Sequence, residues 1–128
     1  MTKTPVRTEA APAPFQGAPY NQAIIANGLV YTAGQVGMDA ATGKLVEGGI
    51  GPETDKTFDN LAAILEAAGS STAKLVKTTV FLTDLNDFKA MNEIYARRVP
   101  APFPARSTFQ VAGLPGGACI EIEVVAVA

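Results

Sequence analysis

The spacing of hydrophobic and polar residues predicts elements in the order strand, strand, helix, strand, helix, strand, strand. Asn27-Gly28 lies between two apolar runs and is the strongest short-range signal for a β-hairpin. In the middle strand, Val76, Val80 and Leu82 are expected to share one face. The predicted strands span residues 23–26, 29–34, 75–82, 105–111 and 119–127, with a shorter one at 44–46.

Two segments place apolar residues at helical spacing and are predicted to be amphipathic helices. The first spans residues 52–68 and is followed by Gly69, a residue type that favours helix ends. The second spans residues 86–98, and either Asp84 or Asn86 is expected to cap it. Their apolar stripes are Phe58, Leu61, Leu65 and Ala68 in the first helix, and Phe88, Met91 and Tyr95 in the second.

Mostly antiparallel strands with two helices predict an α+β fold in which both helices pack on one face of the sheet. The 128 residues suit a single domain, and residues 1–18, rich in Pro, Ala and Thr, are expected to form a loosely ordered arm. In the last strand, the face that carries Glu121 and Glu123 ends in Val125 and Val127. An apolar second face on so small a domain predicts burial against another subunit.

Composition narrows the function classes. The chain has 10 Lys and Arg against 12 Asp and Glu and shows no basic stripe, so nucleic-acid binding is not expected. Histidine is absent, which excludes Ser-His and Cys-His nucleophile systems and histidine-based metal sites. The single cysteine, Cys119, is either a buried structural thiol, which its apolar surroundings favour, or a reactive thiol. No apolar run is long enough to span a bilayer and no signal pattern is seen, so we expect a cytoplasmic protein without a cofactor.

Arg106 and Glu121 are the candidate catalytic residues that the strands carry. An arginine at the entrance of a neutral strand suits bidentate capture of a carboxylate, although the spacing alone favours an ordinary ion pair. A glutamate inside an apolar strand is either a general acid or base with a raised pKa, or a solvent-facing rim residue. Tyr20 is either a binding hydroxyl or a packed ring, and Asn92 lies off the stripe of the second helix.

A hairpin of the last two strands would place Phe109 near Ile122 and would put Arg106, Thr108, Gln110 and Glu121 on one face. In that register Arg106 and Glu121 are several residues apart along the sheet. The site would then need a neighbouring subunit or a bent strand.

Nearly the whole chain resembles the Rid family (reactive intermediate deaminases, also called YjgF), in particular its arginine-containing deaminase branch. The most specific motifs are residues 104–107, Pro-Ala-Arg-Ser, and residues 114–115 leading to Ile-Glu-Ile-Glu at 120–123. The other similar segments are residues 28–35, 60–69, 76–82 and 84–88, together with Asn92 and Tyr95.

This resemblance implies a chorismate-mutase-like homotrimer with its sites in clefts between subunits. It implies hydrolysis of 2-aminoacrylate-type enamines or 2-imino acids to 2-keto acids and ammonia. Arg106 would bind the substrate carboxylate, helped by main-chain groups near Gly34 and Thr108. Glu121 would position or activate the attacking water. Tyr20 and Asn92 would line or support the cleft.

The chain departs from the family pattern at two positions. Many members carry a cysteine where this chain has Thr108, and a serine where it has Ala33. Two other functions therefore stay open. One is a non-catalytic sensor of small carboxylates such as keto acids. The other is a ribonuclease or translation inhibitor, an activity attached to some relatives.

Overall fold

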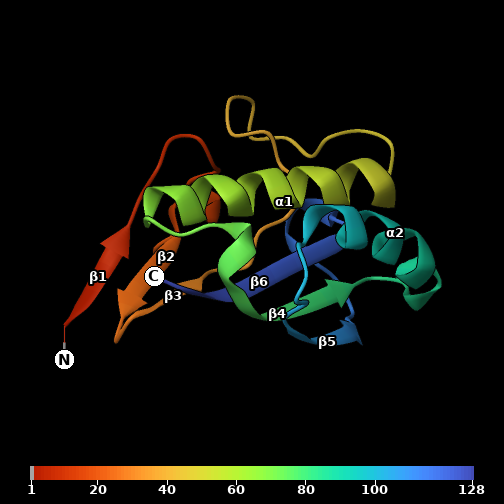
Figure 1. Ribbon diagram of the computed structural model, residues 1–128. Coiled ribbons are helices and arrows are strands. Elements are labelled where there is room, and N and C mark those ends of the chain that lie inside the picture. Colours follow the sequence, from red (N-terminus) through yellow and green to blue (C-terminus); the bar gives the residue numbers. More distant parts are fainter. Residues whose placement is uncertain (1) are drawn as a thin grey trace.

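The computed structural model describes residues 2–128, which form a six-stranded sheet with two α-helices covering one face (Figure 1). The predicted α+β class is thereby confirmed. The helices are α1 (Ile50–Ala67) and α2 (Phe88–Arg98). The strands are β1 (Lys3–Val6), β2 (Ala23–Ala26), β3 (Leu29–Thr32), β4 (Leu75–Leu82), β5 (Ala105–Gln110) and β6 (Ile120–Val127).

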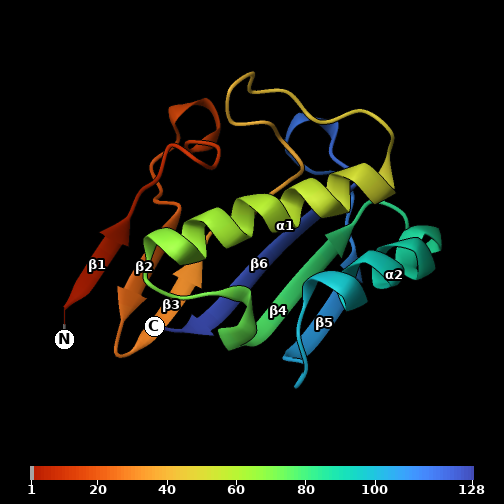
Figure 2. The same ribbon diagram turned by 45° about the horizontal axis from the view of Figure 1, so that its top comes forward.

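The strands lie in the order β1-β2-β3-β6-β4-β5, as Figure 2 shows. β4 and β5 run parallel, and the other neighbouring strands run antiparallel. The sheet is therefore mostly antiparallel, with β5 as one edge and β1 as the other. α1 lies across β6 and β3, while α2 lies beside α1 on the same face of the sheet (Figures 1 and 2).

The hairpin predicted at Asn27-Gly28 joins β2 to β3. Both residues adopt positive φ, +52° for Asn27 and +78° for Gly28, which is the backbone that a tight two-residue turn requires. Ala26 lies opposite Leu29, so the two strands pair directly on either side of the turn.

The helix predictions are confirmed, with shifted starts. α1 begins two residues earlier than predicted, and Gly69 follows it at a φ of +79°. The Asp84 side chain accepts a hydrogen bond from the Asn86 N–H, as a cap does, but a short 3₁₀ turn over Leu85–Asp87 comes first. α2 therefore starts at Phe88.

The main hydrophobic core lies between α1, α2 and the sheet. Burial of these side chains is the principal stabilising term of such a layer. Alternation along β4 and β6 directs every second residue into it. Its fully buried members include Phe58, Leu61, Ile64, Leu65, Leu82, Met91, Ile120 and Ile122.

The expected hairpin between the last two strands is wrong. β6 inserts between β3 and β4, and β5 pairs with β4 on the other side. Phe109 therefore lies opposite Phe81, and Ile122 lies opposite Val80. Alternation of apolar residues specifies which face a residue takes but not which strand lies beside it. The apolar alternation therefore could not show that the chain crosses over after β5 and places β6 between β3 and β4.

Two smaller expectations also change. Val76 is exposed because a bulge between Leu75 and Lys77 interrupts the alternation of β4. Residues 44–46 contribute a single bridge, from Leu45 to Met38, in place of a strand.

Residues 1–18 carry more regular structure than their composition indicated. β1 pairs with β2 over its full length. The side chain of Gln22, which is 3% exposed, donates hydrogen bonds to the carbonyls of Thr8, Ala11 and Pro12 and accepts one from the Thr8 N–H. This buried amide ties the segment after β1 to the start of β2.

The face of the sheet away from the helices is open and partly apolar, as the last strand indicated. Tyr31, Phe109 and Val127 are 45%, 53% and 47% exposed on it. Phe109 stacks on Phe81 with ring centroids 6.4 Å apart. Side chains of this size are mostly covered in a folded protein, so this face is suited to contact another subunit.

Candidate active site

One cavity gathers four of the residues that the sequence singled out. It measures about 360 Å³ and lies on the open side of the sheet. Its lining residues are Phe15, Ala18, Tyr20, Ala33, Gly34, Pro115 and Glu121. Hereafter it is called the Glu121 cavity.

Backbone pairing fixes the position of Glu121 in this cavity. Just after β3, Gln35 and Ile122 exchange both backbone hydrogen bonds, at 2.9 and 3.0 Å. Gly34 and Glu121, the residues that precede this pair on the two strands, are diagonal neighbours, and the Glu121 side chain reaches over Gly34. A Cβ added to Gly34 would overlap the Glu121 carboxylate and lie 2.7 Å from its Cδ. Only glycine at residue 34 leaves room for the carboxylate in this place.

The carboxyl group of Glu121 has a raised pKa. Burial of the half-buried side chain is the main cause, and the like charge of Glu123 adds to it. A carboxylate with a raised pKa is a better proton acceptor near neutral pH than an ordinary glutamate. Across the cavity, the Tyr20 hydroxyl oxygen accepts a hydrogen bond from the Phe15 N–H at 2.6 Å. That bond fixes the ring and leaves the hydroxyl proton free to be donated.

A second cavity, of about 370 Å³, contains Arg106 and is hereafter the Arg106 cavity. The guanidinium carbon of Arg106 lies over two aromatic rings of α2, 4.7 Å from the centroid of Tyr95 and 5.4 Å from that of Phe88. Among residues 2–128, the salt bridges are those of Arg98 and none involves Arg106. Its donors are therefore available to an anionic ligand. The lining residues are Asn92, Tyr95, Ala96, Phe103, Pro104 and Arg106.

The two cavities lie on opposite faces of the sheet. Arg106 pairs with Thr78, which is fully buried under the helices, so Arg106 points to the helix side. Glu121 pairs with Phe81 and points to the open side. The expectation that Arg106, Thr108, Gln110 and Glu121 share one face is thus wrong, because it rested on the hairpin that does not form. Within one chain, Arg106 and Glu121 cannot contact the same small molecule.

Comparison with known proteins gives the family. Residues 8–128 match the family model described as Endoribonuclease L-PSP. The chain is 50% identical over 126 residues to Reactive Intermediate Deaminase A, chloroplastic, of Arabidopsis thaliana. The chain belongs to the Rid family.

The similarity to Rid proteins extends over most of the chain. The match to the Arabidopsis protein covers 98% of this chain and 66% of that relative. The 2-iminobutanoate/2-iminopropanoate deaminase of Homo sapiens is 47% identical over 117 residues, 91% of this chain and 85% of the relative. The crystal structure of Escherichia coli TdcF with bound serine superposes with a TM-score of 0.90 at 36% identity, covering 98% of each chain.

The structure places Asn92 beside Arg106, whereas Thr108 lines neither of the two cavities. Asn92 was expected off the stripe of α2, but it is half-buried and lines the Arg106 cavity, because it lies one turn after Phe88 and about one turn before Tyr95. Thr108 lies on the Arg106 side of β5 but lines neither cavity. Its Oγ1 is buried and has no hydrogen-bond partner among the described residues.

Sequence reasoning missed the aromatic residues around Arg106. Tyr95 and Phe88 were interpreted only as core residues of a helix stripe, and Phe88 is in fact 41% exposed. Phe103, 61% exposed, was not considered. No signal in the sequence indicated these rings, because only the pairing of β5 with β4 brings Arg106 beside them.

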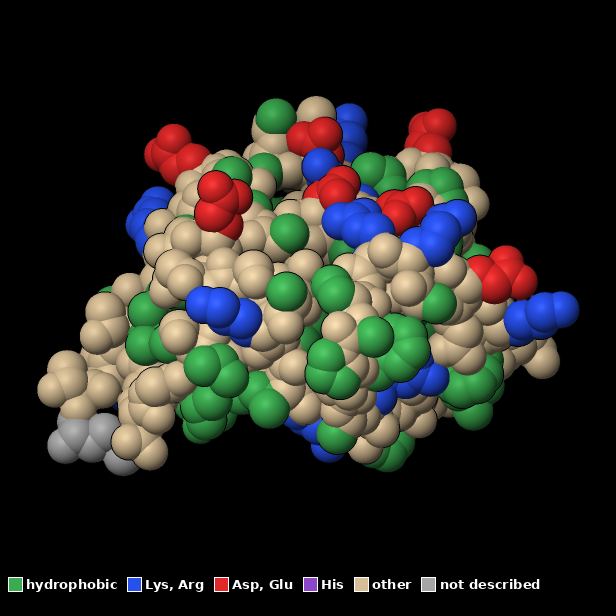
Figure 3. Space-filling view, in the orientation of Figure 1, with side chains coloured by type: hydrophobic (Ala, Val, Ile, Leu, Met, Phe, Trp, Pro, Cys, Tyr) green, Lys and Arg blue, Asp and Glu red, His purple; other side chains and the backbone are tan. Residues whose placement is uncertain are grey.

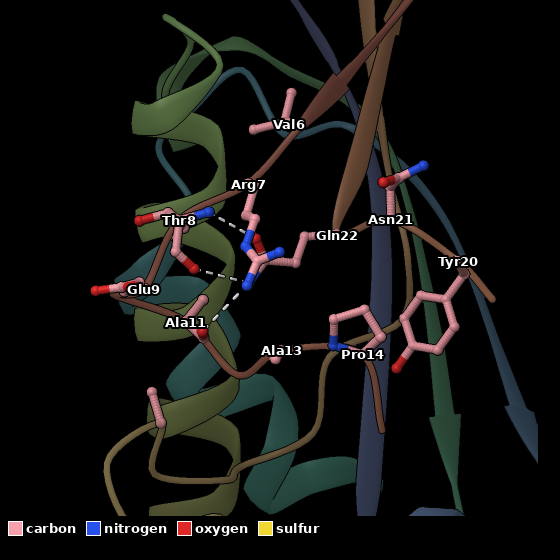
Figure 4. A pocket seen from close by; sticks show the side chains of 11 residues that line it. Val6, Arg7, Thr8, Glu9, Ala11, Ala13, Pro14, Tyr20, Asn21 and Gln22 are labelled. Atoms are coloured by element: carbon pink, nitrogen blue, oxygen red, sulfur yellow. Dashed lines mark hydrogen bonds between the residues drawn. The ribbon is translucent and has the colours of Figure 1, made fainter. Parts of the chain in front are cut away.

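A third cavity of this Rid-family chain, about 410 Å³, lies beside the first segment of the chain (Figure 4). Tyr20 borders both this cavity and the Glu121 cavity. The charged residues that line this third cavity, Arg7 and Glu9, are of opposite sign. The side-chain amide of Gln22 is engaged by backbone groups, as the dashed lines of Figure 4 show. It offers less defined chemistry than the two smaller cavities.

Two further findings bear on the site. Within residues 2–128, no cluster of three His, Cys, Asp or Glu side chains is arranged to hold a metal ion, and no helix has the length and apolar character to cross a membrane. Cys119 is half-buried, so it is less enclosed than expected. Burial, together with the Glu53 carboxylate beside it, raises the pKa of its thiol to about 11, which keeps the sulfur protonated and unreactive at neutral pH.

Proposed function

We propose that this protein is an imine deaminase that hydrolyses 2-aminoacrylate-type enamines and their 2-imino acid tautomers to 2-keto acids and ammonia. The observation that carries the proposal is a pair of complementary groups: the unpaired guanidinium of Arg106 and the half-buried Glu121 carboxylate beside Gly34. Relatives named as deaminases at 47% and 50% identity support the same chemistry.

Arg106 is the proposed carboxylate anchor. Its planar fork of N–H donors matches a carboxylate in a bidentate pair, and its charge persists at any working pH. Main-chain groups near Gly34 and Thr108 would share in holding the substrate. The serine bound in the Escherichia coli relative is a small molecule with such a carboxylate.

Glu121 is the proposed general base. It takes one proton from a water molecule while the water oxygen bonds to the C=N carbon, and the imine nitrogen receives a proton. The resulting carbinolamine releases ammonia as its C–N bond breaks, and the remaining hydroxyl becomes the carbonyl of the keto acid. The imine carbon is already electrophilic, so neither a metal nor a covalent nucleophile is required. Tyr20 and Asn92 would contact the substrate from the two walls.

The proposed active unit is a homotrimer in which Arg106 of one chain faces Glu121 of the next. Two observations support it: the two residues lie on opposite faces of one sheet, and the open face presents Tyr31, Phe109 and Val127 to solvent. A cyclic arrangement repeats one contact around a closed ring and makes three equivalent sites.

The proposal is tested by hydrolysis of 2-iminopropionate, generated in the assay from serine by a dehydratase. We expect the wild-type protein to accelerate pyruvate formation and Arg106→Ala to leave it at the uncatalysed rate. Arg106→Lys serves as the matched control, since it keeps the charge but loses the fork, and should retain only a small part of the activity. If the wild-type protein gives no acceleration, the deaminase proposal fails for this substrate.

The other two functions predict different results. A sensor would bind a keto acid and gain thermal stability without turnover. A ribonuclease would cleave RNA with strong salt dependence. In Figure 3 acidic and basic side chains are interspersed on the side of the helices, without a basic stripe, which favours the deaminase over RNA binding. A cytoplasmic location stays a prediction, and the Arabidopsis relative is named as chloroplastic.

A further inference from the structure

The guanidinium of Arg106 lies against aromatic rings of α2 and, within residues 2–128, forms no salt bridge with an acidic side chain. Its carbon atom lies 4.7 Å from the Tyr95 centroid and 5.4 Å from the Phe88 centroid. Phe88 and Tyr95 are seven residues apart, two helical turns, so they project from the same side of α2. A cation over ring faces is attracted by the ring quadrupole without its N–H donors being used.

Tyr95 is itself fixed from two other directions. Its hydroxyl shares a 2.7 Å hydrogen bond with the Thr78 hydroxyl, and both groups are buried. Its ring meets Phe58 edge to face, with centroids 5.6 Å apart and an interplanar angle of 75°. A tyrosine held at its hydroxyl and at its edge has little freedom to turn its face away from Arg106.

Thr78 closes a loop of contacts around the arginine. It is the direct neighbour of Arg106 in the ladder between β4 and β5, and the two side chains lie on the same face. The strand pair thus sets the distance from Thr78 to the Arg106 backbone. The hydrogen bond sets the distance from Thr78 to Tyr95, and the ring sets the place of the guanidinium.

We propose that Tyr95, anchored by Thr78, is the positioning residue that holds the Arg106 guanidinium for carboxylate capture, with Phe88 as the second ring. This inference rests on the proposed role of Arg106 as a carboxylate anchor. An arginine held by rings pays less conformational entropy when the ligand binds, and its donors stay free. An acidic partner would hold it as firmly but would compete with the substrate carboxylate.

The experiment is titration calorimetry with 2-oxobutanoate as the probe, alongside thermal unfolding. We expect Tyr95→Leu to raise the Kd about tenfold, the loss of a partly desolvated ring contact, and Phe88→Leu to raise it about threefold. Tyr95→Phe keeps the ring and loses only the anchor, so its Kd should rise by about twofold to threefold. Phe88 is 41% exposed, which makes Phe88→Leu informative even if Tyr95→Leu does not fold.

Ile94→Ala is the control for a purely structural effect. Ile94 is buried in the same helix and contacts neither Arg106 nor its cavity. It should lower the unfolding temperature and leave the Kd of the folded protein unchanged. In the kinetic assay, Tyr95→Leu should raise KM far more than it lowers kcat, because it weakens binding and not the proton transfer.

The proposal is overturned if folded Tyr95→Leu and Phe88→Leu bind 2-oxobutanoate as the wild type does, or if Ile94→Ala weakens binding as much. It is also overturned if the wild type does not bind this keto acid. Failure of the deaminase proposal looks different: the wild type would bind 2-oxobutanoate and show the ring dependence, but would not hydrolyse 2-iminopropionate.

Discussion

The Glu121 carboxylate occupies the space that a side chain at residue 34 would fill. The bridge between Gln35 and Ile122 makes Gly34 and Glu121 diagonal neighbours, and burial on that side raises the pKa of the carboxyl group. The requirement for glycine here is one of space, since Gly34 does not adopt positive φ. At the scale of single residues, the position of the Glu121 carboxylate depends on the absence of a side chain at Gly34.

Replacing Gly34 by Ala should reduce activity and leave the fold intact. The new methyl group would displace the carboxylate, which is the movable end of a side chain, so the backbone need not shift. We expect kcat to fall by about tenfold to a hundredfold, because a misplaced catalytic group loses much of its contribution. Gly113→Ala is the control, since no atom lies within 4 Å of the added Cβ. Equal activities of the two variants in the imine assay would contradict this reading.

The raised pKa of Glu121 predicts the acid side of the pH profile. Only the ionised carboxylate accepts a proton, so kcat/KM should fall as pH decreases through a value above the usual glutamate range. Glu123→Gln removes the like charge that contributes to the shift, so the fall should move to lower pH. The measurement is kcat/KM against pH for both proteins. An unchanged or upward-shifted limb in Glu123→Gln would mean that Glu123 does not act on Glu121.

Of the residue roles, those of Arg106 and Glu121 could be suggested from the sequence because a charge inside a neutral strand needs an explanation. The roles of Tyr95 and Phe88 could not be suggested from the sequence. An aromatic residue on a helix stripe reads as core, and only the pairing of β5 with β4 brings Arg106 to these rings.

At the scale of elements, α1 holds the segment that leads from β3 through the Glu121 cavity. The fully buried Asn60 donates hydrogen bonds from Nδ2 to the carbonyls of Val36 and Met38, at 3.0 and 2.9 Å. Glu53, also buried, accepts one from the Cys119 N–H at 2.8 Å, just before β6. Polar side chains of one helix thus satisfy backbone groups of both segments that carry the site.

Asn60→Ala should destabilise the protein more than any exposed substitution in α1. It leaves two buried carbonyls without partners, which costs about 1–3 kcal/mol in unfolding free energy, and it opens a small cavity. Urea denaturation with Glu66→Ala as the control measures the difference, since Glu66 is exposed on the same helix. A loss below about 0.5 kcal/mol, the usual range for surface substitutions, would show that water replaces the amide.

The sequence predicted the elements well because helices and strands differ in the period of their apolar residues. It did not predict that β6 inserts between β3 and β4. Strands 105–111 and 119–127 look like a hairpin in the sequence, but the turn residues between them only permit a reversal and do not impose pairing. Which strands become neighbours is decided by how well the whole face of the sheet packs under α1 and α2.

At the scale of the whole molecule, both the open face of the sheet and the separation of the two cavities favour association between chains. A chain that exposes Tyr31, Phe109 and Val127 on one face gains stability when that face is covered. The same association would bring the Arg106 cavity of one chain against the Glu121 cavity of another. The sequence could suggest a subunit contact from the apolar second face of the last strand, but not the side of the sheet on which each site residue lies.

The most direct test is complementation between Arg106→Ala and Glu121→Gln, each inactive alone, co-expressed with different affinity tags and purified through both. Every trimer that carries both tags holds at least one copy of each variant, so about one third of its sites combine an intact Arg106 with an intact Glu121 from the neighbouring chain. We predict that the mixed protein hydrolyses 2-iminopropionate at about a third of the wild-type rate. Doubly tagged trimers that stay inactive would contradict a site shared between chains.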